Sequence, residues 1–193
     1  MTTNLYLARH GQTQWNKVQR FQGQLNSDLT EQGKQQAEKI ALQLKNKQLD
    51  LIVSSTLERA VVSANICQQQ LSTPILRLKG LSERHLGDWQ GQYIDELKTA
   101  GNYQEIFHQF TALSPQGGES AQGCGERIYQ TLKSLAQDQQ NKNVLVIFHG
   151  EALRCFLAKV GHSATDNAYD LFDNGCILQF CYHHENQNFQ RLT

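Results

Sequence analysis

The feature that most constrains the fold is the run NVLVIFHG at residues 143–150, which passes directly into EALRCFLAKV. The first stretch is almost continuously apolar, as expected of a strand buried on both faces. The second stretch has the pattern of a helix. A strand that leads straight into a helix is the repeating unit of parallel sheets, so this pair of segments predicts such a sheet.

The same alternation of strands and helices recurs along the chain. Further strands are expected at 4–8, 50–55 and 74–78, and helices at 30–44, at 57–68 and from about 119 to before 143. Residues 92–113 suggest an irregular helical segment, and the last 18 residues predict a closing hairpin around HENQ. Together these elements predict an α/β fold around a mostly parallel sheet.

The composition limits the classes of function. The chain has 193 residues, two prolines and no low-complexity linker, which favours a single domain over 1–193. Its formal net charge is zero, so no global basic field exists to bind nucleic acid or an anionic membrane. Five cysteines without a C-x-x-C pair predict reduced thiols, and the N-terminus lacks a signal-peptide pattern. We therefore expect a cytoplasmic protein of unknown oligomeric state.

Side chains that can carry charge or exchange a proton follow several of the expected strands. They are Arg9, His10, Arg59, Glu83 and His149. Ligands of open parallel sheets bind outside the carboxyl ends of the strands, so these groups are expected at one edge. Each alone is most often an ordinary surface residue. However, an apolar strand followed by His-Gly occurs twice, in YLARHG and VIFHG, and this repetition favours a common site.

This set of groups suits phosphoryl transfer. Guanidinium groups match phosphate oxygens, and a neutral imidazole is a nucleophile near neutral pH. One histidine can take the phosphoryl group while the arginines and the other histidine hold its oxygens. A carboxylic acid can then protonate the leaving alkoxide. Gly11 lets the backbone come close to a ligand. The chemistry requires no metal or other cofactor, and no metal-ligand spacing is present.

Six stretches resemble, in order, the motifs of the histidine phosphatase superfamily in its phosphoglycerate mutase-like branch. They are RHGQTQWN, FQGQLNSDLTEQGKQQA, SSTLERAVVSA, LSERHLGDWQG, GGES and VIFHGEALR. The resemblance covers nearly the whole chain. It implies a three-layer α/β/α sandwich and a substrate that is a small phosphorylated metabolite.

The resemblance also implies roles for individual residues. His10 corresponds to the residue that becomes phosphohistidine, and Glu83 to the proton donor for the leaving group. The residues expected to hold the phosphoryl group or line the substrate side are Arg9, Gly11, Asn16, Gln22, Gly23, Arg59, His149 and Gly150. No residue is expected to bind a metal.

Two departures from the family pattern lie beside His149. Phe148 replaces a frequent serine, which removes a hydroxyl near the site. Glu151 replaces a neutral residue, and a carboxylate there weakens dianion binding unless it meets a cation or points outward. The hypothesis at this stage is that Glu151 helps to select the substrate.

Three functions remain open from the sequence. The preferred one is a metal-independent phosphomonoesterase similar to histidine acid phosphatases, and α-ribazole phosphate is one plausible substrate. A phosphoglycerate mutase is less favoured because mutases of this superfamily carry longer insertions and a tail, whereas 43 residues follow Gly150 here. A catalytically silent phosphate-binding regulatory module is the third, although a degenerate site usually lacks one of the five charged or imidazole groups.

Overall fold

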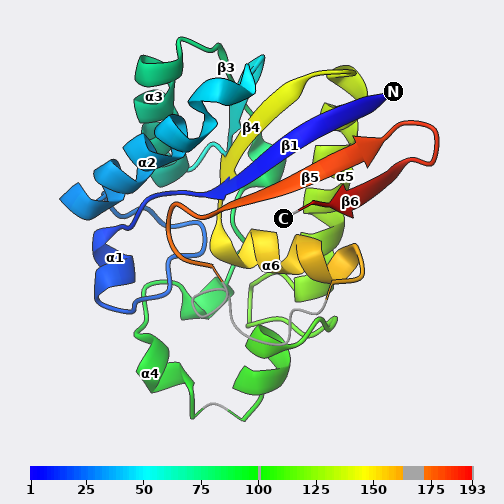
Figure 1. The fold of residues 1–193 in the computed structure, drawn as a ribbon. Coiled ribbons are helices and arrows are strands. Elements are labelled where there is room, and N and C mark those ends of the chain that lie inside the picture. The colour runs from blue at the N-terminus through cyan, green and yellow to red at the C-terminus, as the bar shows by residue number, and fades with distance from the viewer. Residues whose placement is uncertain (100, 163–171, 193) are drawn as a thin grey trace.

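A six-stranded sheet forms the centre of the molecule (Figure 1). The computed structural model describes residues 1–99, 101–162 and 172–192. The strands are β1 (Thr2–Arg9), β2 (Leu51–Ser54), β3 (Ile75–Arg77), β4 (Asn143–Phe148), β5 (Ile177–His183) and β6 (Asn188–Arg191), in the spatial order β3-β2-β4-β1-β5-β6. The first four are parallel to one another, and β5 and β6 form the antiparallel hairpin at one edge. The predicted α/β fold with a mostly parallel sheet and a closing hairpin is confirmed.

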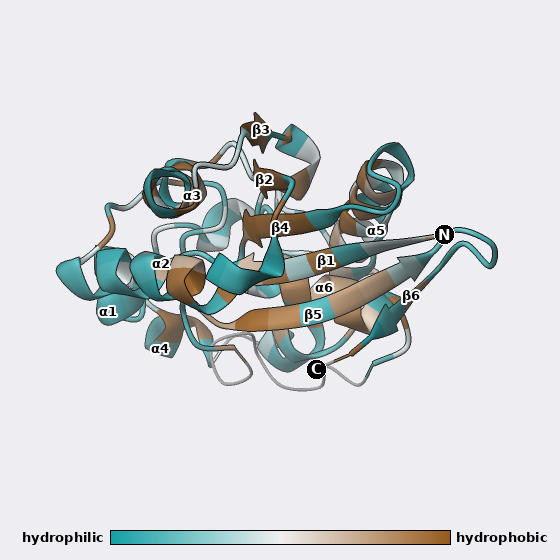
Figure 2. Ribbon diagram, turned by 45° about the horizontal axis from the view of Figure 1, so that its top comes forward, coloured by the Kyte–Doolittle hydropathy of each residue, from teal (hydrophilic) through white to brown (hydrophobic). Residues whose placement is uncertain are grey.

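Helices cover both faces of the sheet. On one face lie α2 (Glu31–Leu44) and α3 (Glu58–Leu71), and on the other lie α5 (Ala121–Asp138) and α6 (Gly150–Lys159). Figure 2 shows apolar residues concentrated in the strands, and helices in which hydrophilic and apolar residues alternate. This is the expected three-layer arrangement. Within the described ranges, no helix combines the length and the apolar character that crossing a membrane requires.

Burial on both faces explains the apolar strands. In β1, Leu5 and Leu7 face the helices α5 and α6, whereas Tyr6 and Ala8 face α2 and α3. The side chains of β4 alternate in the same way because successive residues of a strand point to opposite faces. Since neither face meets water, no polar residue interrupts the run from 144 to 148.

Two helices begin at a capping side chain. The Thr30 hydroxyl accepts a hydrogen bond from the Gly33 amide at 3.0 Å, and the Ser120 hydroxyl accepts one from the Gly123 amide at 3.0 Å. Each bond satisfies one amide that lacks a partner inside its helix, which stabilises the start of α2 and of α5 by about 1 kcal/mol.

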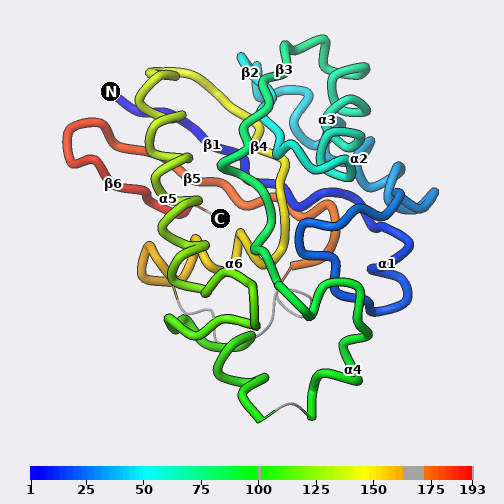
Figure 3. Tube along the Cα trace, turned by 180° about the vertical axis from the view of Figure 1, so that it is seen from behind, coloured from blue at the N-terminus to red at the C-terminus, as the bar shows by residue number. Residues whose placement is uncertain are grey.

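A separate irregular segment lies beyond the carboxyl ends of the parallel strands (Figures 1 and 3). We call residues 86–119 the cap segment; residue 100 lies outside the described part of the chain. Its regular elements are a 3₁₀ turn (Gly87–Trp89), α4 (Ile94–Leu97) and a π-helical turn (Gln104–His108). Further short elements elsewhere are α1 (Gln14–Lys17) and 3₁₀ turns at Lys45–Lys47 and Lys79–Leu81. The expected irregular helix over 92–113 is thus two short turns.

The cap segment has its own small core. Its buried members are Phe21, Leu86, Trp89, Ile94, Tyr103, Ile106 and Phe107. The Phe21 ring lies edge-on to the Phe107 ring with centroids 4.8 Å apart, and Trp89 stacks with Tyr103 at 5.7 Å. Because Phe21 belongs to the loop after α1, this aromatic cluster joins the cap segment to the carboxyl ends of the parallel strands.

Candidate active site

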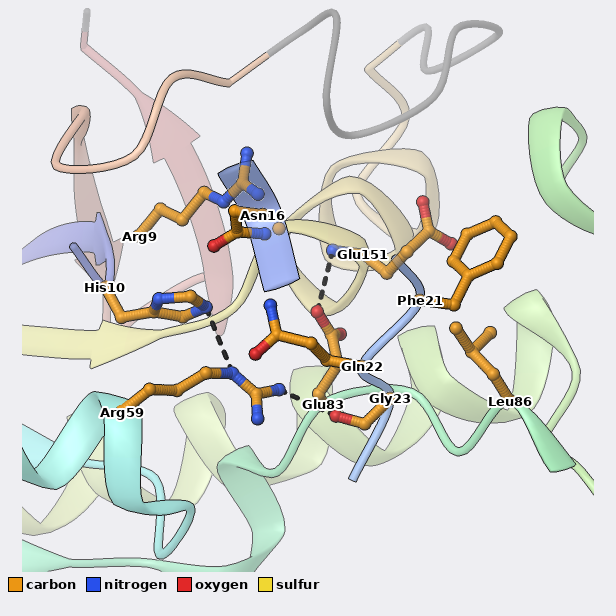
Figure 4. Close-up of a pocket in the computed structure, with 11 residues that line it drawn as sticks. Arg9, His10, Asn16, Phe21, Gln22, Gly23, Arg59, Glu83, Leu86 and Glu151 are labelled. Carbon is orange, nitrogen blue, oxygen red and sulfur yellow. Dashed lines mark hydrogen bonds between the residues drawn. The ribbon is translucent and has the colours of Figure 1, made fainter. Parts of the chain in front are cut away.

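A pocket lies where the parallel strands end (Figure 4). It is lined by Arg9, His10, Asn16, Phe21, Gln22, Gly23, Arg59, Glu83, Leu86, Gly150 and Glu151. Most residues named from the sequence therefore meet around one pocket. Two of the predicted residues, His149 and Gly11, do not line the pocket. The His149 ring lies 5.2 Å from the His10 ring, measured between centroids. Gly11 packs against α2, where a Cβ would come within 2.0 Å of the Gly33 carbonyl oxygen.

The hydrogen bonds of His10 determine which ring nitrogen faces the pocket. Its Nδ1 lies 2.7 Å from the carbonyl oxygen of Gly11, and a carbonyl oxygen only accepts, so Nδ1 carries the proton. Nε2 is then unprotonated and accepts from Nε of Arg59 at 3.2 Å. Burial lowers the pKa of His10 well below its usual value, and the charges of Arg59 and Arg9 lower it further. His10 is therefore a neutral imidazole with its lone pair on Nε2.

Arg59 is held rigidly at the other side of the pocket. It lies in the first turn of α3, is 2% exposed, and donates to the carbonyl oxygens of Gly23 at 2.6 Å and Leu25 at 2.8 Å. Gly23 has a φ of +52°, and a Cβ there would lie 2.3 Å from the Gln90 side chain. Glycine at this position adopts the positive φ without strain and leaves room for the Gln90 side chain, which lets the loop at 23–25 approach Arg59.

Arg9 and Asn16 form the wall of the pocket above His10 (Figure 4). Arg9 is the last residue of β1 and donates to the carbonyl oxygen of Phe172. Asn16 accepts from the Thr13 amide at 3.1 Å in a capping box at the start of α1. The side-chain amide of Asn174 donates to the His10 carbonyl oxygen at 3.0 Å and to Oδ1 of Asn16 at 3.3 Å. Sequence reasoning did not identify Asn174, because only the fold brings it beside β1.

His149 is a buried second imidazole. Its Nε2 lies 2.7 Å from the hydroxyl of Ser55, and its Nδ1 is buried without a hydrogen-bond partner among the described residues. Burial lowers the pKa of His149 well below its usual value, with Arg59 and His10 adding to the effect. Phe148 points into the core, so the hydroxyl that contacts His149 comes from Ser55 on the neighbouring chain segment. The loss of a serine at 148 therefore does not leave this histidine without a hydroxyl partner.

The Glu83 carboxyl group binds the first turn of α6. Its Oε1 accepts from the amides of Arg84 and Ala152, both at 2.8 Å, and its Oε2 accepts from the amide of Glu151 at 3.2 Å. Burial raises the pKa of Glu83 and the Glu151 carboxylate raises it further, against the lowering effects of Arg59 and the amides. With fewer amide bonds, Oε2 is the oxygen better able to carry a transferable proton.

Glu151 has partners inside the protein. Its carboxylate points away from His10 in Figure 4, and it accepts from Nε and Nη2 of Arg154 at 2.8 and 3.1 Å and from Nη1 of Arg84 at 3.3 Å. Burial alone would raise the pKa of Glu151, but Arg154 and Arg84 outweigh it and keep the group ionised. The carboxylate is therefore paired inside the protein, and the hypothesis that Glu151 helps to select the substrate stays a prediction. The three-residue spacing of Glu151 and Arg154 signals this ion pair in the sequence.

The amide of Gln22 has an unused acceptor. Gln22 is 4% exposed, lines the pocket, and its Oε1 has no hydrogen-bond partner among the described residues. Figure 4 shows the amide group between His10 and Glu83. Two guanidinium groups, the neutral imidazole of His10, two side-chain amides and the Glu83 carboxyl group with its raised pKa therefore line the pocket, and the second neutral imidazole, His149, lies next to His10. Such a set can bind a phosphate and exchange a proton beside it.

Comparisons with known proteins agree with this geometry. Residues 5–193 match the histidine phosphatase superfamily (branch 1). The chain is 34% identical to the metal-independent phosphoserine phosphatase of Arabidopsis thaliana over 84% of this chain and 71% of that protein. It is also 34% identical to a protein of Escherichia coli named probable phosphoglycerate mutase GpmB, over 81% and 74% of the two chains.

A solved structure extends the similarity to the fold. The phosphoserine phosphatase of Entamoeba histolytica, in complex with 3-phosphoglyceric acid, superposes with a TM-score of 0.82 and 27% identity over 99% of this chain and 95% of that one. The match of the family over almost all of the chain, together with the arrangement of Arg9, His10, Arg59, Glu83 and His149, leads to one conclusion. The chain belongs to branch 1 of the histidine phosphatase superfamily.

Proposed function

We propose that this protein is a metal-independent phosphomonoesterase that hydrolyses a small phosphorylated metabolite through a phosphohistidine on His10. The observation that carries the proposal is the orientation of the His10 ring, whose proton is held on Nδ1 by the Gly11 carbonyl. The unprotonated Nε2 lies at the pocket beside Arg59, on the side where a phosphoryl group can be attacked.

The first half of the reaction transfers the phosphoryl group to the protein. The lone pair of His10 Nε2 forms a bond to phosphorus while the bond from phosphorus to the leaving oxygen breaks. Arg9, Arg59 and His149 bind the non-bridging oxygens and stabilise the charge that develops there. Glu83 gives its proton to the leaving oxygen, and burial raises its pKa, which favours the protonated acid that this step requires.

The second half of the reaction returns the protein to its starting state. Glu83 is now ionised and accepts a proton from a water molecule. The water oxygen forms a bond to phosphorus, and the N–P bond breaks with its electron pair returning to His10 Nε2. Inorganic phosphate is released and Glu83 is again protonated, so the same carboxyl group acts as acid and then as base.

Phosphate release in the presence of EDTA tests the proposal. We expect turnover of p-nitrophenyl phosphate and of at least one of phosphoserine and 3-phosphoglycerate, and an acid-labile, alkali-stable phosphoprotein after rapid quenching. His10→Ala should abolish both signals. His183→Ala is the matched control, because His183 pairs with Thr2 at the opposite end of β1. Wild-type protein that binds phosphate but turns over none of the three compounds would instead support a regulatory module.

A phosphoglycerate mutase is the second candidate, and it is supported by the 34% identity to the E. coli relative with that name. A mutase returns the phosphoryl group to the organic substrate, whereas a phosphatase gives it to water. The protein should therefore be incubated with 3-phosphoglycerate, with and without 2,3-bisphosphoglycerate. Isomerisation faster than phosphate release would favour the mutase and overturn our preference.

A further inference from the structure

We propose that Glu151, clasped between Arg84 and Arg154, is a positioning residue that controls how firmly Glu83 holds its proton. The inference rests on the proposed function of Glu83 as general acid. Glu151 is 4% exposed and both arginines are fully buried, so this ion cluster lies within the protein directly behind the acid.

Glu151 is joined to the Glu83 loop in two ways. Its amide donates to Oε2 of Glu83, and its carboxylate accepts from Arg84, the residue that follows Glu83 in the chain. Arg84 also donates to the carbonyl oxygens of Glu119 and Ile106, both at 2.9 Å, which anchors the cap segment at the same point. A single residue of α6 thus fixes both the carboxyl group of the acid and the loop that carries it.

The charges in this cluster act on Glu83 through a buried environment where screening is weak. The charged groups that act on Glu83 are Arg59 from α3, Arg127 from α5 and Glu151 from α6. Arg84 and Arg154 bind the Glu151 carboxylate, and Glu119 binds Arg127. Arg9 and the neutral His10 line the same pocket as Glu83. Glu151 is the carboxylate that raises the pKa of Glu83 among these groups. With it present, Arg84, Arg154 and Glu151 together carry one net positive charge; without it they carry two.

The variant Glu151→Gln isolates this charge. It keeps the backbone amide that binds Glu83 and nearly the same side-chain volume, but removes the anion. The alkaline limb of the pH profile of kcat/KM, which reports loss of the Glu83 proton, should move to lower pH by on the order of one unit. Titration of ¹³C-labelled glutamate by NMR, with the Glu83 signal assigned by Glu83→Gln, should show the same shift without relying on activity.

A double variant separates charge from packing. Glu151→Gln with Arg154→Gln restores one net positive charge beside Glu83, so its alkaline limb and NMR titration should return toward the wild-type position. Arg154→Gln alone removes one positive charge beside Glu151. The alkaline limb and the NMR titration of Glu83 should then move to higher pH. If Glu151→Gln does not fold, the difference between Arg154→Gln and the double variant measures the same charge.

Glu126→Gln provides the matched control. Glu126 also forms an ion pair between α5 and α6, with Lys159 at 2.6 Å, but at the protein surface. Its removal should leave the alkaline limb unchanged. The inference is overturned if folded Glu151→Gln titrates like wild type, or if the double variant shifts as far as the single one. If the proposed function itself is wrong, the result is different. Wild-type protein then shows no turnover, or the alkaline limb of its pH profile persists in Glu83→Gln.

Discussion

The sheet with its four flanking helices and the cap segment are built on different principles. In the sheet, neighbouring strands pair over long parallel registers, and side chains alternate between two large cores. In the cap segment, a few aromatic rings and the buried Arg84 hold two short helical turns in place. The regular region carries His10, Arg9 and Arg59, Glu83 lies in the loop that leads into the cap segment, and the cap segment contributes Leu86 to the pocket.

This difference predicts two kinds of mutational effect. Substitutions at the carboxyl ends of the parallel strands should impair the transfer of phosphate from every substrate, because they alter the groups proposed to contact the phosphoryl group. Substitutions in the cap segment should change how well each substrate binds, because they move Phe21 and Leu86, which line the pocket. The predictions below test this division, beginning with the largest expected effect.

Loss of the proposed nucleophile should be the most severe change. His10→Ala is expected to lower kcat by about 10⁴-fold or more for all substrates, because no other group near the pocket replaces Nε2. Steady-state kinetics with an aryl and an alkyl phosphate measure this effect, and near-UV circular dichroism checks the fold. Residual activity within tenfold of wild type would contradict the role of His10.

Loss of the general acid should depend on the leaving group. Glu83→Gln is expected to lower kcat about 10²- to 10⁴-fold for alkyl phosphates such as phosphoserine. The effect should be much smaller for p-nitrophenyl phosphate, because p-nitrophenolate leaves readily without a proton. The ratio of the two kcat values in the variant and in wild type is the measurement. An equal loss for both substrates would show that Glu83 acts otherwise than as a proton donor.

Truncation of one ring should distinguish the two regions directly. Phe107→Ala removes the ring that contacts Phe21 in the cap cluster and should cost about 3–5 kcal/mol of unfolding free energy while raising KM about tenfold. Leu132→Ala in the α5 core is the matched control: it should cost about 2–5 kcal/mol with KM unchanged. Urea unfolding and KM for one substrate test both. Equal KM values in the two variants would remove the distinction between the regions.

The smallest expected effect is on the pH dependence of stability. The pKa of His149 is lowered in the folded protein, so the unfolded chain binds more protons between that lowered value and about pH 6.5. Stability should therefore fall as pH decreases below about 6.5, by at most about 1.4 kcal/mol per pH unit for this group.

The difference between wild type and His149→Gln isolates this contribution. Glu83 has a raised pKa and acts in the opposite sense, since its contribution to stability declines as pH rises. Urea unfolding at pH 7.5 and pH 5.5 should show a smaller loss in the variant than in wild type. An identical loss in both proteins would mean that His149 is not held neutral.

The core of the fold could be predicted because its signals are local. The apolar run at 143–148, the helix predicted at 30–44 and the closing hairpin all appear in the structure close to their expected positions. The cap segment was harder to predict, because its aromatic residues show no regular period and find one another only after the loop containing Phe21 folds back.

The sequence by itself determined the identity of the chemical groups and the edge at which they meet. Two strands that end in His-Gly, with Arg59 and Glu83 after the neighbouring strands, are sufficient for this because parallel strands bring their carboxyl ends together.

Only the tertiary structure decided the state of those groups. The Gly11 carbonyl selects the tautomer of His10, and Ser55 contacts His149. Arg84 and Arg154 form ion pairs with Glu151. The physical reason is that protonation and hydrogen bonding depend on which donors, acceptors and charges lie within a few ångströms and on how little water remains, and the order of residues along the chain does not contain these distances.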